Sequence, residues 1–189
     1  MGYNEQSIVK TLIYSSIFEY PLTKEELWQF AISEKPLHKQ SFFAVLSQSS
    51  ITVKKQHLYT LNYEQALIPI RISREKIAAQ KLRIARRIST ILSHIPTILF
   101  IGISGSLSMA NTKEEDDIDL FIITKQYSVW LTRLCILLIL ELLRKRRKKY
   151  ETKVTNKICV NLLIEESHLA FPISLHNLYT AHEIAQVKP

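Results

Sequence analysis

Three helical patterns and then a strand pattern follow one another along the N-terminal third of the chain. Isoleucine and leucine recur at helical spacing in residues 5–18, which predicts a helix. A second helix is expected to begin after Thr23, because Glu26 three residues later completes a capping box. Residues 38–47 predict a third helix, and residues 51–61 predict a short hairpin. Three helices followed by a hairpin indicate a winged helix-turn-helix.

Longer apolar runs follow, and they predict a second domain that contains a sheet. The predicted helices are 70–93, 131–143 and 175–186, and the predicted strands are 97–101, 117–124 and 157–165. The run 131–143 is the most apolar of the chain, and we interpret it as a buried helix. The expected fold class is α+β, with a winged-helix domain over residues 1–68 and a second domain over residues 69–189.

The length and composition exclude several classes of protein. The chain has 189 residues, of which 47% are hydrophobic and 22% charged, so it is not disordered. The cysteines, Cys135 and Cys159, are too few for a disulfide scaffold and form no zinc motif, which favours a cytoplasmic location. The apolar run 131–143 is shorter than the roughly 20 residues that a transmembrane helix needs. The basic tail 144–149 leaves a peripheral contact with a membrane surface as an alternative.

The net charge of +8 is unevenly distributed. The surplus of lysine and arginine lies in residues 69–95 and 127–157, on either side of an acidic centre at 96–126. We interpret the basic side of helix 70–93 as a solvated face, and the alternative is an electrostatic wall beside a polyanion site. Residues 1–68 are electrically balanced, whereas a DNA reader usually has surplus basic residues. The winged helix is therefore expected to pack or to contact protein, with DNA binding as the weaker alternative.

Candidate chemistry is concentrated in one segment. Two of the three glycines and all three aspartates lie within residues 102–119. Gly105 and Ser106 follow a predicted strand and precede a short helix, whose free N–H groups and the Ser106 hydroxyl would seat a phosphate. Asp117 and Asp119 are two positions apart on the next strand, so their carboxylates point to the same face. Two carboxylates beside a phosphate predict a Mg²⁺ site.

This arrangement resembles the signature of a known superfamily. The Gly-Ser pair, the ten-residue spacer and the Asp-Ile-Asp run are similar to the motif of the nucleotidyltransferase superfamily typified by DNA polymerase beta, and more closely to small bacterial and archaeal nucleotidyltransferase-like proteins. The motif covers residues 101–124, and the order of predicted elements matches over about 69–165. The resemblance implies a mixed sheet flanked by helices and a magnesium-dependent transfer of a nucleoside monophosphate from a nucleoside triphosphate, most simply ATP.

The resemblance also assigns residues. It places Gly105 and Ser106 at the triphosphate, and Asp117 and Asp119 at the metal ions as catalytic ligands. Members commonly continue into a further helical region, so it implies a truncated or minimal form at the C-terminus.

A third carboxylate on a neighbouring strand usually completes the site in this family and can accept a proton. The candidate strand 157–165 has Asn161 at its centre, and an amide can ligate a metal but cannot act as a base. Glu165 has the right parity but lies roughly 13 Å further along. Two hypotheses follow: a nucleotidyltransferase whose acceptor is RNA, a protein or a small molecule, or a catalytically weakened nucleotide-binding or partner-binding module.

The remaining polar residues near the motif have simpler interpretations. Residues 114–115 and Asp116 are interpreted as a solvated rim, and the alternative is that Asp116 helps to hold a second metal through water. Lys113 and Lys125 flank the motif and are expected to be solvated, with triphosphate contact as the alternative. The serines around Gly105 lack the G-x-S-x-G pattern of hydrolases.

Overall fold

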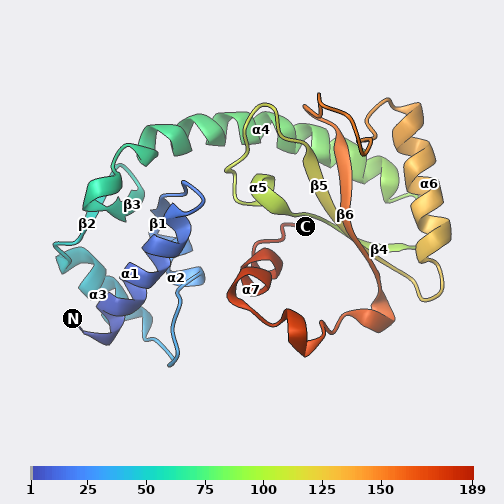
Figure 1. Cartoon of the computed structure of the whole chain (residues 1–189). Coiled ribbons are helices and arrows are strands. Elements are labelled where there is room, and N and C mark those ends of the chain that lie inside the picture. The colour runs from blue at the N-terminus through green and yellow to red at the C-terminus, as the bar shows by residue number, and fades with distance from the viewer. Residues whose placement is uncertain (1) are drawn as a thin grey trace. The chain divides into compact units, whose positions relative to one another are not determined.

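The computed structural model describes residues 2–189. They form two compact units, one that ends at Ser73 and one that comprises Arg74–Pro189. The architecture is α+β, and each unit contains one three-stranded sheet (Figure 1). The boundary between the units falls within the long helix α4 (Leu67–Leu92).

The first unit combines three helices with an antiparallel sheet in which β3 is central. Its elements are α1 (Tyr3–Ser16), β1 (Leu22–Thr23), α2 (Lys24–Gln29), α3 (Lys39–Gln48), β2 (Thr52–Lys55), β3 (Leu58–Leu61) and a 3₁₀ turn (Asn62–Glu64). The three helices and the hairpin lie close to the ranges that the sequence predicts. Thr23 and Glu26 form the expected capping box, because each side chain accepts a hydrogen bond from the other's backbone N–H.

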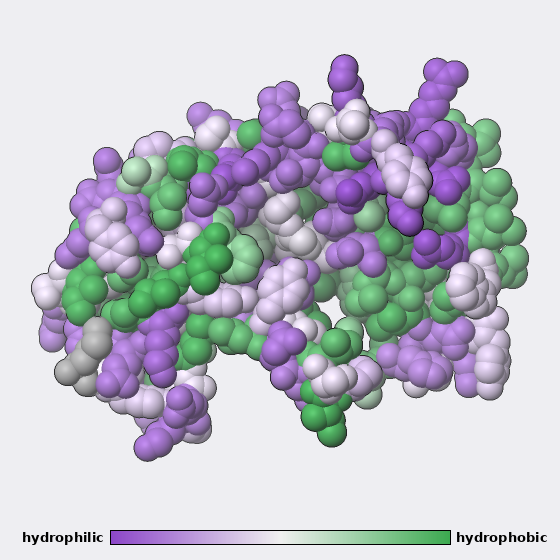
Figure 2. Space-filling model, viewed as in Figure 1, coloured by the Kyte–Doolittle hydropathy of each residue, from purple (hydrophilic) through white to green (hydrophobic). Residues whose placement is uncertain are grey.

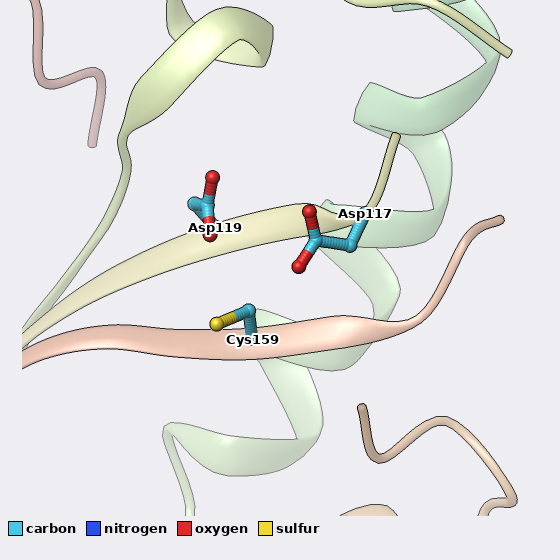
Figure 3. A group of neighbouring side chains, drawn as sticks. All are labelled: Asp117, Asp119 and Cys159. Carbon is cyan, nitrogen blue, oxygen red and sulfur yellow. The ribbon is translucent and has the colours of Figure 1, made fainter. Parts of the chain in front are cut away.

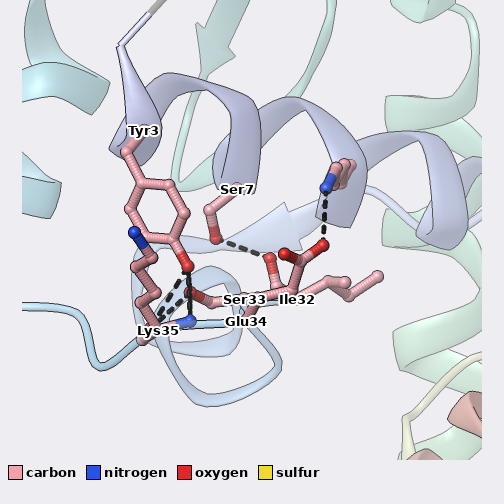
Figure 4. Close-up of polar contacts among 7 residues, drawn as sticks. Tyr3, Ser7, Ile32, Ser33, Glu34 and Lys35 are labelled. Carbon is pink, nitrogen blue, oxygen red and sulfur yellow. Dashed lines mark hydrogen bonds and ion pairs between the residues drawn. The ribbon is translucent and has the colours of Figure 1, made fainter.

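Side-chain hydrogen bonds attach the loop between α2 and α3 to α1 (Figure 4). Ser7 Oγ donates to the carbonyl of Ile32 at 2.9 Å. The Tyr3 hydroxyl lies 2.7 Å from Ser33 Oγ and accepts a hydrogen bond from the backbone N–H of Lys35. These bonds satisfy polar groups of a segment that has no helix or strand of its own, and they hold it against α1.

The second unit is built on a mixed sheet with the order β4-β5-β6. Its elements are β4 (Ile98–Ile103), α5 (Gly105–Ser108), β5 (Ile118–Thr124), α6 (Val129–Leu142), β6 (Ile158–Glu165), two 3₁₀ turns (Glu166–His168 and Ile173–Leu175) and α7 (Leu178–Ala185). β4 is antiparallel to β5, and β5 is parallel to β6. Helix α6 makes the crossover that a parallel pair requires.

The two faces of β5 differ in burial. Ile118, Leu120 and Ile122 are fully buried and belong to the core that α4 and α6 form on one side of the sheet. The intervening side chains, among them Asp119 and Phe121, are only partly buried. Because side chains alternate along a strand, Asp119 lies on the face opposite to this core.

The C-terminal segment pairs with the last residue of β4. The backbones of Ile103 and Lys188 exchange two hydrogen bonds, at 2.7 and 3.0 Å. The preceding residue, Val187, packs on Gly102 so closely that a Cβ there would lie 2.5 Å from Val187 Cγ1. The last residue of β4 is therefore paired, and Gly102 leaves room for Val187.

The interpretation of residues 131–143 as a buried helix is wrong for one of its sides. Ile136 and Leu140 are fully buried, whereas Leu138 and Leu142 are 56% and 83% exposed. An apolar composition alone does not show which side of a helix packs. Within the described residues, no helix is long and apolar enough to cross a membrane.

The basic side of α4 is also not simply a solvated face. Arg71 and Lys81 are 3% and 2% exposed. Arg71 lies over the ring of Tyr20 and pairs with Glu26 at 3.3 Å. Buried basic side chains of this kind need partners, so part of the positive charge of this helix is structural.

Candidate active site

Two aspartates and a cysteine meet on the face of the sheet opposite to the core (Figure 3). Asp117 immediately precedes β5, Asp119 is its second residue, and Cys159 is the second residue of β6. The parallel register pairs Asp119 with Cys159, and the three ligand atoms lie within 4.8 Å of one another. The two aspartates therefore share one face, as their spacing predicts.

Gly105 lies directly against Asp119. Its φ of +63° is in the left-handed region, and a Cβ on Gly105 would lie 2.7 Å from Asp119 Oδ2. The N–H of Ser104 donates to the carbonyl of Asp119 at 3.0 Å. This turn requires glycine both for its conformation and for the space that the carboxylate occupies. The glycine and aspartate parts of the motif are thus brought together.

Asp116 organises the loop that leads into β5. One of its carboxylate oxygens accepts hydrogen bonds from Ser106 Oγ at 3.3 Å, Thr112 Oγ1 at 3.2 Å and the backbone N–H of Lys113 at 2.8 Å. Residues 114–115 are exposed, as expected. The interpretation of Asp116 as part of a solvated rim holds only in part, because the residue is partly buried and its carboxylate is bonded within the loop. The Ser106 side chain itself is exposed.

A buried lysine of α4 holds the same loop. Lys81 Nζ donates to the carbonyls of Glu114, at 3.0 Å, and Asp116. Burial lowers the pKa of Lys81, and the acidic residues of the loop, led by Asp116, oppose that shift. Sequence reasoning missed this role. The available signal is helical spacing, because Lys81 lies on the same side of the helix as the buried Ala78 and Ala85.

The site is a cluster of negative charge that is only partly compensated. Burial, followed by the neighbouring Asp117 carboxylate, raises the pKa of Asp119 to about 6. Arg147 Nη1 lies 2.6 Å from Asp117 Oδ2 and forms an ion pair with it. The Cys159 thiol hydrogen-bonds Asp119, and burial and the two carboxylates raise the pKa of this thiol.

A further carboxylate, on Glu183 of α7, influences this cluster but is not one of the three groups whose ligand atoms lie within 4.8 Å of one another. Glu183 is close enough to contribute to the raised pKa of Asp119, and burial raises the pKa of Glu183 itself. Tyr179 forms a hydrogen bond with Glu183. The sequence predicts helix 175–186 but contains no local signal of where this helix packs, so it does not identify Glu183.

The residue of β6 that lies beside Asp119 is not the one that the sequence suggests. Asn161 is exposed at a bulge in the β5–β6 pairing, and its Nδ2 lies 3.5 Å from Ser104 Oγ. The residue opposite Asp119 is Cys159, and Glu165 lies at the other end of β6. The expectation that Asn161 takes this position is therefore wrong. On β6, all of whose residues the structure describes, the Cys159 thiol stands beside Asp119 where the Asn161 amide was expected.

The two flanking lysines lie at different distances from the aspartates. Lys113 is exposed in the loop before β5. Lys125 follows the opposite end of β5, six residues beyond Asp119, which is roughly 20 Å at the rise of a strand. Of these two residues, only Lys113 stays a candidate for contact with a triphosphate.

No family model matches the chain, and no curated protein or solved structure matches it either. The α+β architecture is what the structure shows. The winged helix and the nucleotidyltransferase fold stay predictions from the sequence.

Proposed function

We propose that this protein is a magnesium-dependent nucleotidyltransferase, which moves a nucleoside monophosphate from a nucleoside triphosphate to an acceptor hydroxyl. The observation that carries the proposal is the contact of Gly105 with Asp119, beside Asp117. These residues are separated in the sequence, and they meet at one point of the sheet. The resemblance of this motif to the superfamily supplies the type of reaction.

The side chains at this point fit a hard divalent cation. Asp117 and Asp119 offer carboxylate oxygens, which are the ligands that magnesium prefers. A nearby cation would also relieve the repulsion that helps to raise the pKa of Asp119. The Cys159 thiol is a soft donor, so we assign the cation to the aspartates alone. When bound, magnesium neutralises charge on phosphate oxygens.

Other residues of the chain would bind the triphosphate. Ser106 is exposed next to Gly105, and its hydroxyl, which donates to Asp116 at 3.3 Å, would turn from that carboxylate to donate to a phosphate oxygen. The Arg147 side chain is 43% exposed while it pairs with Asp117, so its guanidinium can also reach an anion in solvent. Arginine suits this role because its planar fork matches phosphate oxygens.

Nucleotide binding without transfer is the second candidate, and Cys159 is the observation that favours it. A thiol whose pKa is raised is protonated at neutral pH and cannot accept a proton from an attacking hydroxyl. Glu183 of α7 acts on Asp119 electrostatically but lies outside the group of three ligand atoms, so it would have to move toward the aspartates to supply the missing carboxylate. The two candidates therefore differ in whether Glu183 replaces the carboxylate that β6 lacks.

Calorimetric titration with each of the four nucleoside triphosphates, with and without magnesium, tests the shared part of the proposal. We expect magnesium-dependent binding that is lost in Asp117→Asn/Asp119→Asn. The matched control is Glu114→Gln/Glu115→Gln, which removes two carboxylates from the exposed loop and should bind like the wild type. Absence of binding by the wild type, or equal binding by the aspartate double variant, would contradict the proposal.

Transfer of an α-phosphate label separates the two candidates. Label transferred by the wild type to RNA, protein or an aminoglycoside, and lost in Glu183→Gln, supports an enzyme. Binding without transfer, with transfer gained in Cys159→Asp, supports a module that has lost its third carboxylate.

A further inference from the structure

Helix α6 presents an apolar side to solvent. Its outward residues follow one another at helical spacing and are 54–83% exposed: Trp130, Leu131, Leu134, Leu138 and Leu142. We call these five residues the α6 outer face, and the apolar surface along α6 is visible at the right of Figure 2. The opposite side of the helix holds the fully buried Ile136 and Leu140. The helix is therefore apolar on both sides but packed on only one, which is unusual for a surface helix.

A strongly basic segment borders this face. Six consecutive basic residues, 144–149, follow the helix directly. Glu141, on the outward side of the helix, pairs with Lys148 at 2.9 Å and with Arg146 at 3.6 Å. These pairs place the basic segment beside the α6 outer face and neutralise the Glu141 carboxylate. Over residues 127–157 there are nine basic and two acidic side chains, so a large positive excess remains.

We propose that the α6 outer face and the basic segment dock this protein on a membrane surface that contains anionic lipids. Apolar side chains of an interfacial helix insert at the boundary of headgroups and acyl chains, while neighbouring lysines and arginines attract anionic headgroups. Trp130 and the 89% exposed Tyr127 lie at one end of the face and are of the type that prefers this boundary. The helix lies in the plane of the surface, and its packed side stays on the sheet.

A second copy of the chain fits the α6 outer face less well than an anionic membrane surface does. Pairing of two α6 outer faces supplies no negative charge for the basic segment. In a parallel arrangement it would also bring two basic segments together, and like charges repel. A surface of opposite charge satisfies both the apolar face and the basic segment.

Flotation with lipid vesicles tests the proposal on the full chain. Vesicles of phosphatidylcholine alone are compared with vesicles that also contain about 30% phosphatidylserine, a proportion chosen for strong surface charge. Replacing Trp28 by phenylalanine leaves Trp130 as the only tryptophan, so a blue shift of its emission reports insertion. We expect flotation and a blue shift with the anionic vesicles, and neither with phosphatidylcholine.

Matched variants separate the two parts of the surface. Leu134→Glu/Leu138→Glu should abolish flotation, whereas Ile17→Glu, a change at a 70% exposed isoleucine of the first unit, should not. Lys145→Gln/Lys149→Gln should weaken partitioning about 30-fold, at about fivefold per basic residue, whereas Lys54→Gln/Lys55→Gln should leave it unchanged. Circular dichroism checks each fold, and Leu134→Gln/Leu138→Gln replaces the glutamate pair if that pair unfolds.

Several results would overturn the proposal. Flotation with neither vesicle, or equally with both, would exclude recognition of anionic lipid. Flotation that survives both leucine double variants would exclude the α6 outer face. A dimer that dissociates in the leucine variants, measured by sedimentation equilibrium, would show that a second copy covers this face instead.

Discussion

Replacing Asp119 by asparagine is expected to stabilise the metal-free fold at neutral pH. The carboxylate has a pKa of about 6 in the folded protein against an ordinary value of 3.8, because burial and the neighbouring Asp117 oppose its ionisation. This difference corresponds to about 3 kcal/mol of unfolding free energy at about 1.36 kcal/mol per pH unit. Because the carboxylate is partly exposed and solvent screens it, we expect about half of that, about 1.5 kcal/mol.

The gain in stability should depend on pH. A carboxylate whose pKa is raised by folding binds more protons in the folded than in the unfolded state between pH 3.8 and about 6. The unfolding free energy of the wild type therefore falls as the pH rises through that range. Asparagine does not titrate, so the unfolding free energies of the variant and the wild type should be similar below about pH 4. Above about pH 6 they should differ by the whole expected amount.

Urea denaturation in the presence of a chelator, repeated across this pH range, measures the effect. Hydrogen exchange of the amides of β5 assigns the change to the second unit. Asp116→Asn is the matched control, because it weakens three hydrogen bonds to a charged acceptor and should lower stability by about 1 kcal/mol. A variant Asp119→Asn that is less stable than the wild type at pH 7, or a gain that does not change with pH, would refute the reasoning.

Three further substitutions probe the surroundings of the site. Gly105→Ala should lower the unfolding free energy by about 1–3 kcal/mol, because residue 105 has a positive φ and the Asp119 carboxylate occupies the space that a Cβ needs. Urea denaturation measures this loss, and a variant as stable as the wild type would contradict the prediction. Gly102→Ala should release the C-terminal segment, seen as faster amide exchange at Lys188, and Val187→Ala in the same chain should restore part of the protection, because the Phe100 ring also lies 2.8 Å from that Cβ. Lys81→Met should cost about 2–3 kcal/mol and make loop 111–117 sensitive to protease, because it removes two hydrogen bonds to carbonyls, whereas Arg86→Met at an exposed position should do neither.

Features that depend on neighbours in the sequence were predictable. The capping box at Thr23 and Glu26 requires only a spacing of three residues, and the structure contains it. The alternation along β5 is equally local, and it is enough to place Asp117 and Asp119 on one face. Gly105 was also identifiable, because glycine before a short helix indicates a tight turn.

Features that depend on register between distant segments were not predictable. Parity along β6 is the same for Cys159 and Asn161, so the sequence cannot say which one lies beside Asp119. The choice depends on how β6 pairs with β5 and on the bulge between Leu120 and Phe121. Glu183 was missed for a similar reason, since its position depends on the path of the chain after β6.

An unfavourable charge of the second unit lies where a bound cation would offset it. Asp119 carries a charge that burial and Asp117 oppose, and Gly105, which adopts its left-handed conformation without strain, leaves room for this carboxylate. A few residues away, Asp116 and Lys81 have well-placed partners, so the loop itself is not poorly built. Such a local departure from what favours the fold is typical of functional sites. A cation on the aspartates would remove the electrostatic part of the conflict. Asp119→Asn should therefore change stability and magnesium-dependent binding in opposite directions, which a residue with a purely structural role would not do.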